Sequence, residues 1–372
     1  MPLYMDIHKF DEITIADVKK AHQYDKSIQD QYGVKYHQFW VNEKEGFVFC
    51  LVEGPDKDTC RMVHQYAHGF VACNIVEVEP GFFKLFMGDG QPVEQGLVQN
   101  DNGLPDPGYR HIMAIEIRAN TNITRSEDYK HLWMPHKCKN LALDRVARFN
   151  GRVVEINGDE GLVGVFNTAV NAVRCAKDLQ YELKERRKNN PDDPELDVSF
   201  RIGLLTGHPL TEEAGFFARA LVFARRLCLT ANENEVLVSS RTNEICMLED
   251  TSQLRPLTNS DESFINELFE LVEPNLPDKN FNVDQLSRTL GVSRPQLYRK
   301  IVSLTGRSPN DFISALRMDK ALSLMKHKFG NVSEVALEVG YHSPSYFSRC
   351  FQKSYGCTPS EFVKAYDSTR NL

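Results

Sequence analysis

Two histidines, His64 and His68, stand four residues apart in the segment HQYAHG, which ends at Gly69. A glycine at this place is typical of a helix end, and side chains four residues apart share one helix face, together with Cys60 one turn earlier. Imidazole and thiolate donors at this spacing suit Ni, Cu, Zn or Co better than Mg or Ca. The segment is therefore a candidate transition-metal site.

Other interpretations of this segment compete with the metal site. Hydrolytic chemistry of the H-E-x-x-H type needs a carboxylate base after the first histidine, and Gln65 stands there instead. A histidine near a helix end can also bind the last carbonyl groups and favour the helix dipole. Metalloprotease chemistry is thus disfavoured, whereas metal binding and a purely structural role both stay open.

The first 87 residues predict the fold that positions these side chains. Strands are expected at LYMDIH (3–8), KYHQFWV (35–41), FVFCLVE (47–53) and NIVEVE (74–79), with helices at about 15–32 and 56–68. The order βαββαβ is that of a ferredoxin-like sandwich. Because side chains alternate along a strand, Asp6 and His8 share one face of the first strand.

Residues 1–86 resemble a small ferredoxin-like family that has a nickel-binding member, with FVFCLVEGPD and HQYAHG as the most telling pieces. The resemblance implies a transition-metal ion as ligand, nickel before the others, and leaves the ligand set open. The candidate ligands are, in descending order, His64 and His68, then His8, Cys50 and His22, and last His37 and Cys60.

A repeat with a spacing of 50 residues marks the end of the chain, where residues 293–313 match residues 343–363. Identical residues stand at Ser293/Ser343, Arg299/Arg349, Gly306/Gly356, Pro309/Pro359 and Phe312/Phe362. Each copy follows a short helical segment and a glycine, which predicts helix, tight turn, helix. A long helix from Asp311 to about His327 joins the two units.

The second helix of each unit is expected to turn apolar residues inward, namely Leu297, Ile301, Leu304, Phe347 and Phe351. The stretch GYHSPSYFSRCF (340–351) and the segments around it resemble the AraC-type DNA-binding domain over its full length. This resemblance implies that the two helices enter successive major-groove segments of double-stranded promoter DNA, with RNA polymerase as a further partner. The implied contact residues are Arg294, Gln296, Tyr298 and Arg299 in the first helix and Ser345, Tyr346 and Arg349 in the second.

The charge distribution agrees with a polyanionic partner for the last part of the chain. Residues 282–364 hold twelve Lys and Arg against six Asp and Glu, a formal charge of +6. Because the whole chain carries -7, the remainder carries -13. A basic unit on an acidic body is typical of a nucleic-acid-binding domain.

Residues 111–240 resemble a class III nucleotide cyclase domain. The segments GRVVEINGDEGLVGVF, RIGLLTG and FFARALVFARRL carry the likeness. The family's chemistry needs two carboxylates for divalent ions, a lysine for the base, and an asparagine and an arginine around the ribose and triphosphate. Asp159 and Arg226 keep two of these roles, and Glu116 replaces an aspartate. Glu155 stands at the lysine position and Val222 at the asparagine position.

The charge reversal at Glu155 disfavours nucleotide turnover, so the domain is predicted not to be an enzyme. Glu116, Asp159 and Arg226 are left as a possible nucleotide-binding remnant, and a purely structural dimerisation fold is the other interpretation. The active sites of this family form between two chains. The resemblance therefore implies a homodimer, which also suits paired DNA half-sites.

Composition bounds the remaining classes of protein. Hydrophobic residues at 41% and charged residues at 26% are typical of a folded globular chain. No apolar run long enough for a membrane span and no secretion signal stand in the sequence, which predicts a cytoplasmic protein. Nine scattered cysteines without a C-x-x-C pair disfavour a disulfide framework and a closed zinc knuckle.

The sequence thus predicts a multidomain α+β protein. Its parts are a ferredoxin-like sensing domain (1–87), a linker (88–110), a cyclase-like α/β domain that is expected not to be catalytic (111–250) and an all-α double helix-turn-helix domain (260–366). The leading hypothesis is an AraC-type transcription regulator that responds to a small ligand or a metal ion through its first domain. The alternatives are a DNA-binding nucleotide cyclase with residual activity and a metal-buffering protein.

Overall fold

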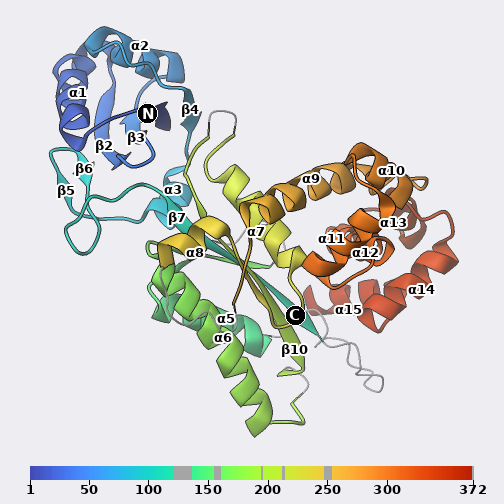
Figure 1. The fold of residues 1–372 in the computed structure, drawn as a ribbon. Helices are drawn as coiled ribbons and strands as arrows, with labels where there is room; N and C mark the ends of the chain where they lie inside the picture. The colour runs from blue at the N-terminus through green and yellow to red at the C-terminus, as the bar shows by residue number, and fades with distance from the viewer. Residues whose placement is uncertain (120–135, 155–160, 194–195, 212–213, 247–253, 371–372) are drawn as a thin grey trace. The chain divides into compact units, whose positions relative to one another are not determined.

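The computed structural model describes residues 1–119, 136–154, 161–193, 196–211, 214–246 and 254–370 (Figure 1). The chain forms two compact units. The first comprises Met1–Ile112, Val165–Ala169 and Thr206–Val222, and the second Met113–Gly164, Val170–Leu205 and Phe223–Leu372. Two mixed sheets and an all-helical region confirm the predicted multidomain α+β class. Among the described helices, none is both long and apolar enough to cross a membrane.

The first unit contains the ferredoxin-like sandwich that the sequence predicts. Its sheet has the strand order β4-β1-β3-β2-β6-β5, of which β1 (Leu3–Lys9), β2 (Lys35–Asn42), β3 (Phe47–Glu53) and β4 (Asn74–Glu77) are the predicted strands. Helices α1 (Ile15–Ile28) and α2 (Lys57–Ala67) connect them and pack against each other. A short 3-10 turn, Gln29–Tyr32, follows α1.

Local signals define both ends of α2. At its start, the Asp56 carboxylate accepts a hydrogen bond from the backbone N–H of Thr59 at 2.7 Å, which satisfies an otherwise unpaired helix donor. At its end, His68 is the cap, and Gly69 has a φ of +81° and donates its N–H to the carbonyl of His64 at 3.0 Å. The helix therefore stops where the sequence predicts, and its last turn carries both histidines.

The segment 88–110, which the sequence predicts to be a linker, contains ordered structure that belongs to the first sheet. Strands β5 (Val93–Glu94) and β6 (Leu97–Val98) pair with each other, and β6 pairs with β2. Both residues of β6 are buried, and burial of this apolar pair outweighs the turn-rich composition around it. A helix that the sequence analysis did not predict, α3 (Pro80–Met87), precedes this segment.

The second sheet has the order β12-β11-β10-β7-β9-β8. Its strands are β7 (Arg110–Ala119), β8 (Arg152–Val154), β9 (Leu162–Phe166), β10 (Val198–Gly207), β11 (Val236–Val238) and β12 (Leu254–Pro256). The helices between them are α5 (His136–Arg148), α6 (Ala169–Asn189), α7 (Ala218–Thr230) and α8 (Ser240–Cys246). The predicted hairpin turn at Asn157–Asp159 lies outside the described residues.

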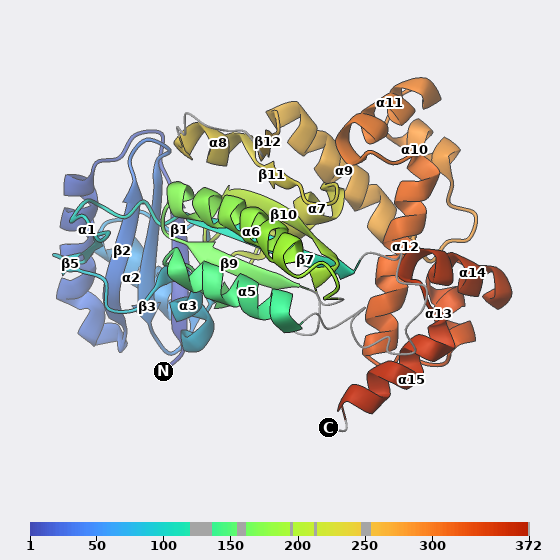
Figure 2. The ribbon, with the colours of Figure 1, turned by 90° about the horizontal axis from the view of Figure 1, so that it is seen from below.

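The rest of the second unit is helical, as the sequence predicts (Figure 2). Helix α9 (Asn259–Asn275) precedes one helix-turn-helix pair, α10 (Val283–Thr289) and α11 (Arg294–Thr305). Helix α12 (Pro309–Lys326) leads to the second pair, α13 (Val332–Glu338) and α14 (Pro344–Tyr355), and α15 (Pro359–Arg370) follows.

The repeated residues have the same structural role in both helix-turn-helix pairs. Ser293 and Ser343 cap the starts of α11 and α14 by accepting backbone N–H groups. Gly306 and Gly356 end these helices with φ values of +66° and +76°, in the left-handed region that favours glycine. The repeated residues therefore define the same helix ends in both pairs, in addition to the same apolar packing.

Candidate functional site

The imidazole of His64 lies between two carboxylates in the first unit. Its Nε2 is 2.8 Å from Oδ2 of Asp6, which comes from β1. Its Nδ1 is 3.2 Å from Oδ1 of Asp25, which comes from α1. All three side chains are buried, with His64 only 1% exposed. Three different elements thus bring one histidine and two acids together away from water.

This arrangement shifts the pKa values of all three groups. Burial alone would lower the pKa of His64, but the charges and hydrogen bonds of Asp6 and Asp25 override it and raise the pKa to about 10. Burial opposes ionisation of both acids, yet His8 and His64 hold the pKa of Asp6 well below its usual range, and His64 and His68 lower that of Asp25. Without a metal ion, His64 is therefore an imidazolium at neutral pH.

Three donor atoms form a nearly equilateral triangle at the end of α2. Oδ1 of Asp25, Nδ1 of His64 and Nε2 of His68 are each 3.2 Å from the other two. Donors about 2.1 Å from a single ion at octahedral or tetrahedral angles are separated by roughly 3.0–3.4 Å. The side chains thus already have the spacing of a two-histidine, one-carboxylate metal site.

A second group shares His64 and is centred on Asp6. It comprises Asp6, His8, Cys50 and His64, whose donor atoms all lie within 4.8 Å of one another. Oδ1 of Asp6 is 3.4 Å from Nε2 of His8 and accepts the backbone N–H of Cys50 at 3.1 Å. Burial and the nearby Asp6 carboxylate raise the pKa of the Cys50 thiol, so the reactive thiolate is disfavoured.

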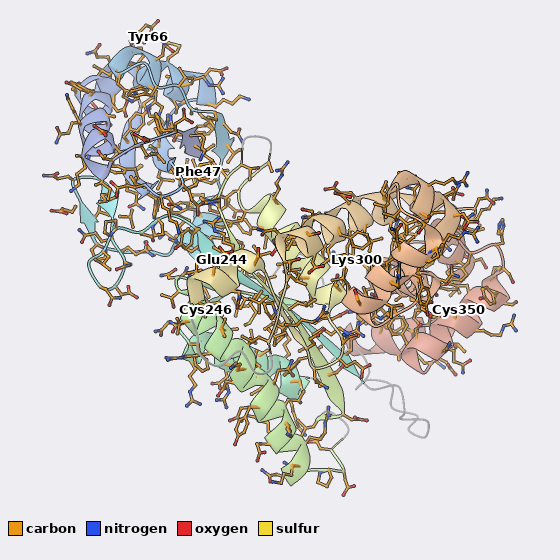
Figure 3. The ribbon with its side chains drawn as sticks, viewed as in Figure 1. Phe47, Tyr66, Glu244, Cys246, Lys300 and Cys350 are labelled. Carbon is orange, nitrogen blue, oxygen red and sulfur yellow. The ribbon has the colours of Figure 1, made fainter. Side chains whose placement is uncertain are left out.

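Asp6 is placed to orient the His64 ring rather than to be a direct ligand of a metal ion. Histidine ligands commonly donate their second ring N–H to a carboxylate, which fixes the ring and increases its basicity. The contact between Nε2 of His64 and Asp6 has this form and leaves Nδ1 directed at Asp25 and His68. The outer face of α2 is separate from this site, since Tyr66 points into solvent and is 65% exposed (Figure 3).

The predicted metal ligands lie in different places in the structure. His64 and His68 meet in the triangle, and His8 and Cys50 lie in the group around Asp6. His22 belongs to neither of these groups; it is buried, and burial followed by the charge of Lys26 lowers its pKa to about 4. Of the two lowest-ranked candidates, His37 pairs with Glu53 at 3.2 Å and Cys60 is buried in the apolar core.

Sequence reasoning missed the two acids. Asp6 stands beside His8 on the predicted strand face, so period-two alternation could have included it. Asp25 stands one helical turn after His22, but nothing in the spacing indicates that α1 faces the end of α2. Both acids come from elements distant in sequence from HQYAHG.

The predicted DNA-contacting residues lie on the open faces of α11 and α14. Arg294, Gln296, Tyr298, Arg299, Ser345, Tyr346 and Arg349 are all exposed. The apolar residues predicted to face inward are buried in both helices. Arg294 forms an ion pair with Asp284, and the Arg349 guanidinium lies 5.6 Å from the Tyr346 ring centroid. Each helix thus offers basic and aromatic side chains to a partner.

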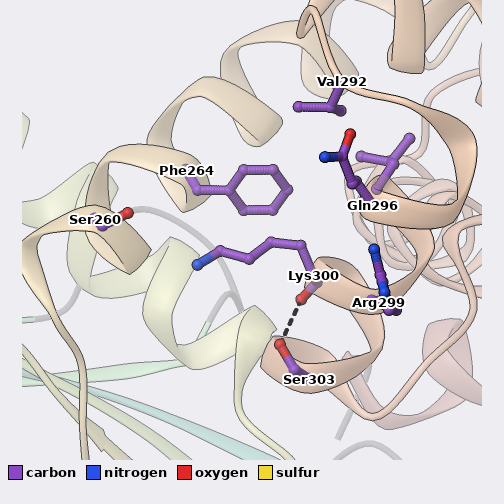
Figure 4. A pocket seen from close by; sticks show the side chains of 8 residues that line it. Ser260, Phe264, Val292, Gln296, Arg299, Lys300 and Ser303 are labelled. Atoms are coloured by element: carbon purple, nitrogen blue, oxygen red, sulfur yellow. Dashed lines mark hydrogen bonds between the residues drawn. The ribbon is translucent and has the colours of Figure 1, made fainter.

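A surface hollow of about 520 Å³ lies between α9 and α11 (Figure 4). Lys300 turns along this hollow toward α9, where its Nζ is 2.5 Å from Asp261 and 5.7 Å from the Phe264 ring centroid. Gln296 and Arg299 line the hollow as well. The side of α11 next to Arg299 is therefore held to α9, which fixes how the helix presents its exposed residues.

The residues of the predicted nucleotide-binding remnant have other partners. Glu116 lies 2.8 Å from Arg118, and Arg226 lies 2.9 Å from Glu273 and 3.1 Å from Asn266. Both charges are therefore engaged by side chains of the chain itself. Asp159 and Glu155 lie outside the described residues.

Comparison with known proteins identifies the last domain. Residues 286–365 match a family model described as helix-turn-helix domain. The HTH-type transcriptional regulator MtrA of Neisseria gonorrhoeae is 34% identical over 88 residues, which are 24% of this chain and 29% of that protein. The C-terminal part of the chain is an AraC-type DNA-binding domain.

Another relative of the AraC-type domain is part of a much larger protein. Histidine kinase P4 of Formosa agariphila is 38% identical over 110 residues, which are 30% of this chain and 8% of the kinase. The chain spans less than a third of the length of each of these two relatives.

The first unit also has a matching family. Residues 4–78 match a model described as nickel responsive protein SCO4226-like. The solved structure of SCO4226 from Streptomyces coelicolor A3(2) is 34% identical and covers 20% of this chain and 94% of that one, with a TM-score of 0.20. The solved structure of an adenylate/guanylate cyclase/hydrolase from Silicibacter pomeroyi is 22% identical. The match covers 38% of this chain and 82% of that one, with a TM-score of 0.32.

We predict that Asp6→Asn destabilises the metal-free first unit by about 3 kcal/mol, because it leaves the His64 imidazolium with one fewer buried counter-charge. Urea unfolding with a chelator present measures this, with Trp40 in β2 as the fluorescent probe in a Trp133→Phe background. Asp58→Asn, at a side chain that is 75% exposed, is the matched control and should change the free energy of unfolding little. Equal effects of the two substitutions would contradict the inferred role of Asp6.

The raised pKa of His64 also predicts how stability depends on pH. The ordinary value is 6.5 and the folded value about 10, so the contribution of His64 is fully present below pH 6.5 and is lost as the pH rises toward 10. The lowered pKa of Asp6 adds a contribution that is present above pH 3.8 and is lost on further acidification. In the metal-free protein, the loss of unfolding free energy between pH 6.5 and 10 should disappear in His64→Gln, as urea unfolding at a series of pH values measures. If the same loss persists in this variant, another group causes it.

Proposed function

We propose that the chain is an AraC-type transcription regulator that binds double-stranded DNA sequence-specifically and responds to a transition-metal ion, nickel first. One observation carries the metal part of this proposal: Asp25, His64 and His68 hold three donor atoms at mutual distances of 3.2 Å. The AraC-type domain, with both recognition helices exposed, supports the DNA part.

The chemistry of the donor set fits a divalent ion of the nickel type. Two imidazoles and one carboxylate suit Ni²⁺, Cu²⁺ and Zn²⁺ better than Mg²⁺ or Ca²⁺. Asp25, His64 and His68 would hold the ion, while Asp6 would keep His64 oriented. A bound ion supplies the positive charge that the proton on Nδ1 of His64 supplies without it. The buried acids are therefore compensated in both states, and loading requires proton release.

The remaining parts of the proposal concern coupling and partners. We propose a sensing domain at residues 1–87, a cyclase-like domain at 111–250 that supports dimerisation without catalysis, and a DNA-binding domain at 260–366. Ion binding would favour one arrangement of the protein over another and so change its affinity for the promoter. RNA polymerase and a second copy of the chain are the further partners, and the cytoplasm is the place of action.

We propose no cyclase activity for this chain. Glu116 and Arg226 both form ion pairs within the chain, which supports this part of the proposal. A carboxylate that neutralises Arg118 is poorly available to a divalent ion, and an arginine held by Glu273 is poorly available to a triphosphate. Incubation with ATP or GTP and Mn²⁺ should therefore give no cyclic nucleotide.

Selection of bound sequences from a randomised DNA library tests the DNA part of the proposal. The full chain should enrich one sequence with two conserved segments about one helical turn apart. Binding to it should weaken steeply as salt rises. A library that stays random after several rounds would overturn the function.

We expect Asp25→Asn, His64→Gln and His68→Gln each to weaken Ni²⁺ binding at least about tenfold in a calorimetric titration, because each removes a donor. His37→Gln is the control, since His37 pairs with Glu53 away from the triangle and its side chain is 30% exposed. If His37→Gln has the same effect as the three site variants, the ion binds elsewhere.

Arg299→Ala and Arg349→Ala should each cost about 1–3 kcal/mol in binding to the selected sequence, because both side chains are exposed on recognition helices. Fluorescence anisotropy with labelled duplexes measures this loss. Arg186→Ala is the control, on helix α6 with a side chain that is 42% exposed. An equal loss in the control would indicate a general effect of charge instead of recognition by α11 and α14.

A further inference from the structure

A partly buried ion-pair cluster connects the second sheet to the helix between the two helix-turn-helix pairs, with side chains that are 16–25% exposed. Nη2 of Arg118, near the end of β7, lies 2.7 Å from Oδ2 of Asp319 and 2.8 Å from Oε1 of Glu116. Asp319 stands in α12. All three residues belong to the second unit. A charge pair thus connects the sheet to α12.

The same cluster reaches the second recognition helix. The hydroxyl of Tyr355, the last residue of α14, donates to Oδ1 of Asp319 at 2.9 Å. One carboxylate therefore accepts hydrogen bonds from the sheet through Arg118 and from the end of α14 through Tyr355. A change in the position of Arg118 would therefore move both α12, through Asp319, and the end of α14, through Tyr355.

The first recognition helix is anchored to the same sheet by a different arginine. Nη2 of Arg255, in β12, donates to the carbonyl of Leu304 in the last turn of α11 at 2.7 Å, and its Nε lies 2.6 Å from Glu235. A cation at a helix C-terminus interacts favourably with the negative end of the helix dipole. Immediately after the helix, a Cβ at Gly306 would lie 2.6 Å from the side chain of Asn232, so the backbone itself lies close against the sheet's loop.

Partial burial makes the charges of the cluster costly, and the members of the cluster compensate one another. Burial opposes ionisation of Asp319, yet Arg118 lowers its pKa. Burial likewise opposes the charge of Arg118, and Asp319 and Glu116 raise its pKa. Such pairs add little net stability compared with apolar residues, but losing one partner is expensive. The cluster therefore selects one position of α12 against others.

The anchors lie at the C-terminal ends of α11 and α14, whereas the proposed DNA-contacting residues begin at their N-terminal ends and are exposed. We propose that Arg118 and Arg255 set the relative position of the two recognition helices, so that the second sheet determines which separation of two DNA segments the protein reads. They are positioning residues that do not touch DNA. This inference rests on the proposed DNA binding.

Base-pair insertion between the two bound segments tests the inference. One added base pair moves the segments apart by about 3.4 Å and rotates them by roughly 35°. The wild-type chain, with both helices fixed, should bind the inserted site at least about tenfold more weakly than the selected site. The double variant Arg118→Met/Asp319→Asn removes both charges of the pair together, and Glu116 keeps Arg201 as a partner at 3.8 Å. For this variant, the ratio of the affinity for the selected site to that for the inserted site should fall toward one.

Two control variants and a folding assay accompany this test. Arg118→Lys keeps the charge and should retain most of the discrimination, and Arg186→Met, on α6, should retain all of it. Thermal unfolding and far-UV circular dichroism show whether the double variant folds. If it does not, Tyr355→Phe removes only the hydroxyl that contacts Asp319, and its ratio should lie between wild type and one.

The outcomes are distinct. An unchanged ratio in the folded double variant, or in Tyr355→Phe if that variant must replace it, overturns the inference and leaves the proposed function intact. Wild-type protein that selects no sequence overturns the proposed function and the inference together. A reduced ratio with an unchanged salt dependence supports the inference, because contacts to phosphates are then kept while the separation is no longer fixed.

Discussion

The pairing of His64 with two buried carboxylates is the interaction on which the first unit depends. Asp6 and Asp25 come from β1 and α1, and their charges are tolerable inside the sandwich only because a positive group stands between them. A proton on His64 supplies that charge without a metal ion. The triangle with His68 offers an ion the same place, so proton and ion compete for one buried position.

Charge compensation also occurs in the second unit, at side chains that are partly buried. Arg118 and Asp319 are a partly buried ion pair that connects the sheet to α12, where each charge is compensated by the other. Glu116, which the cyclase resemblance assigns to a metal ion, is instead a partner of Arg118. In this chain Glu116 and Asp319 share Arg118, so this carboxylate belongs to the contact between the sheet and α12.

Much of this organisation could be predicted from the sequence, and the exceptions have physical reasons. The βαββαβ order and the double helix-turn-helix follow from local periodicity and from serine and glycine at helix ends, which act within a few residues. His64 and His68 share a helix face for the same reason. Asp25 could not be found in this way, because only the packing of α1 against α2 brings it to His68. The strands within residues 88–110 were missed because each holds only two residues.

The most direct measurement is the affinity of the full chain for its selected DNA sequence, with chelator and with Ni²⁺, in wild type and in Asp25→Asn. The account predicts that Ni²⁺ changes the wild-type affinity by about fivefold or more, the usual size of an allosteric coupling, and that Asp25→Asn abolishes the response while its affinity with chelator stays that of wild type. An affinity that is the same with and without Ni²⁺ in the wild type, or an equal response in Asp25→Asn, would contradict it.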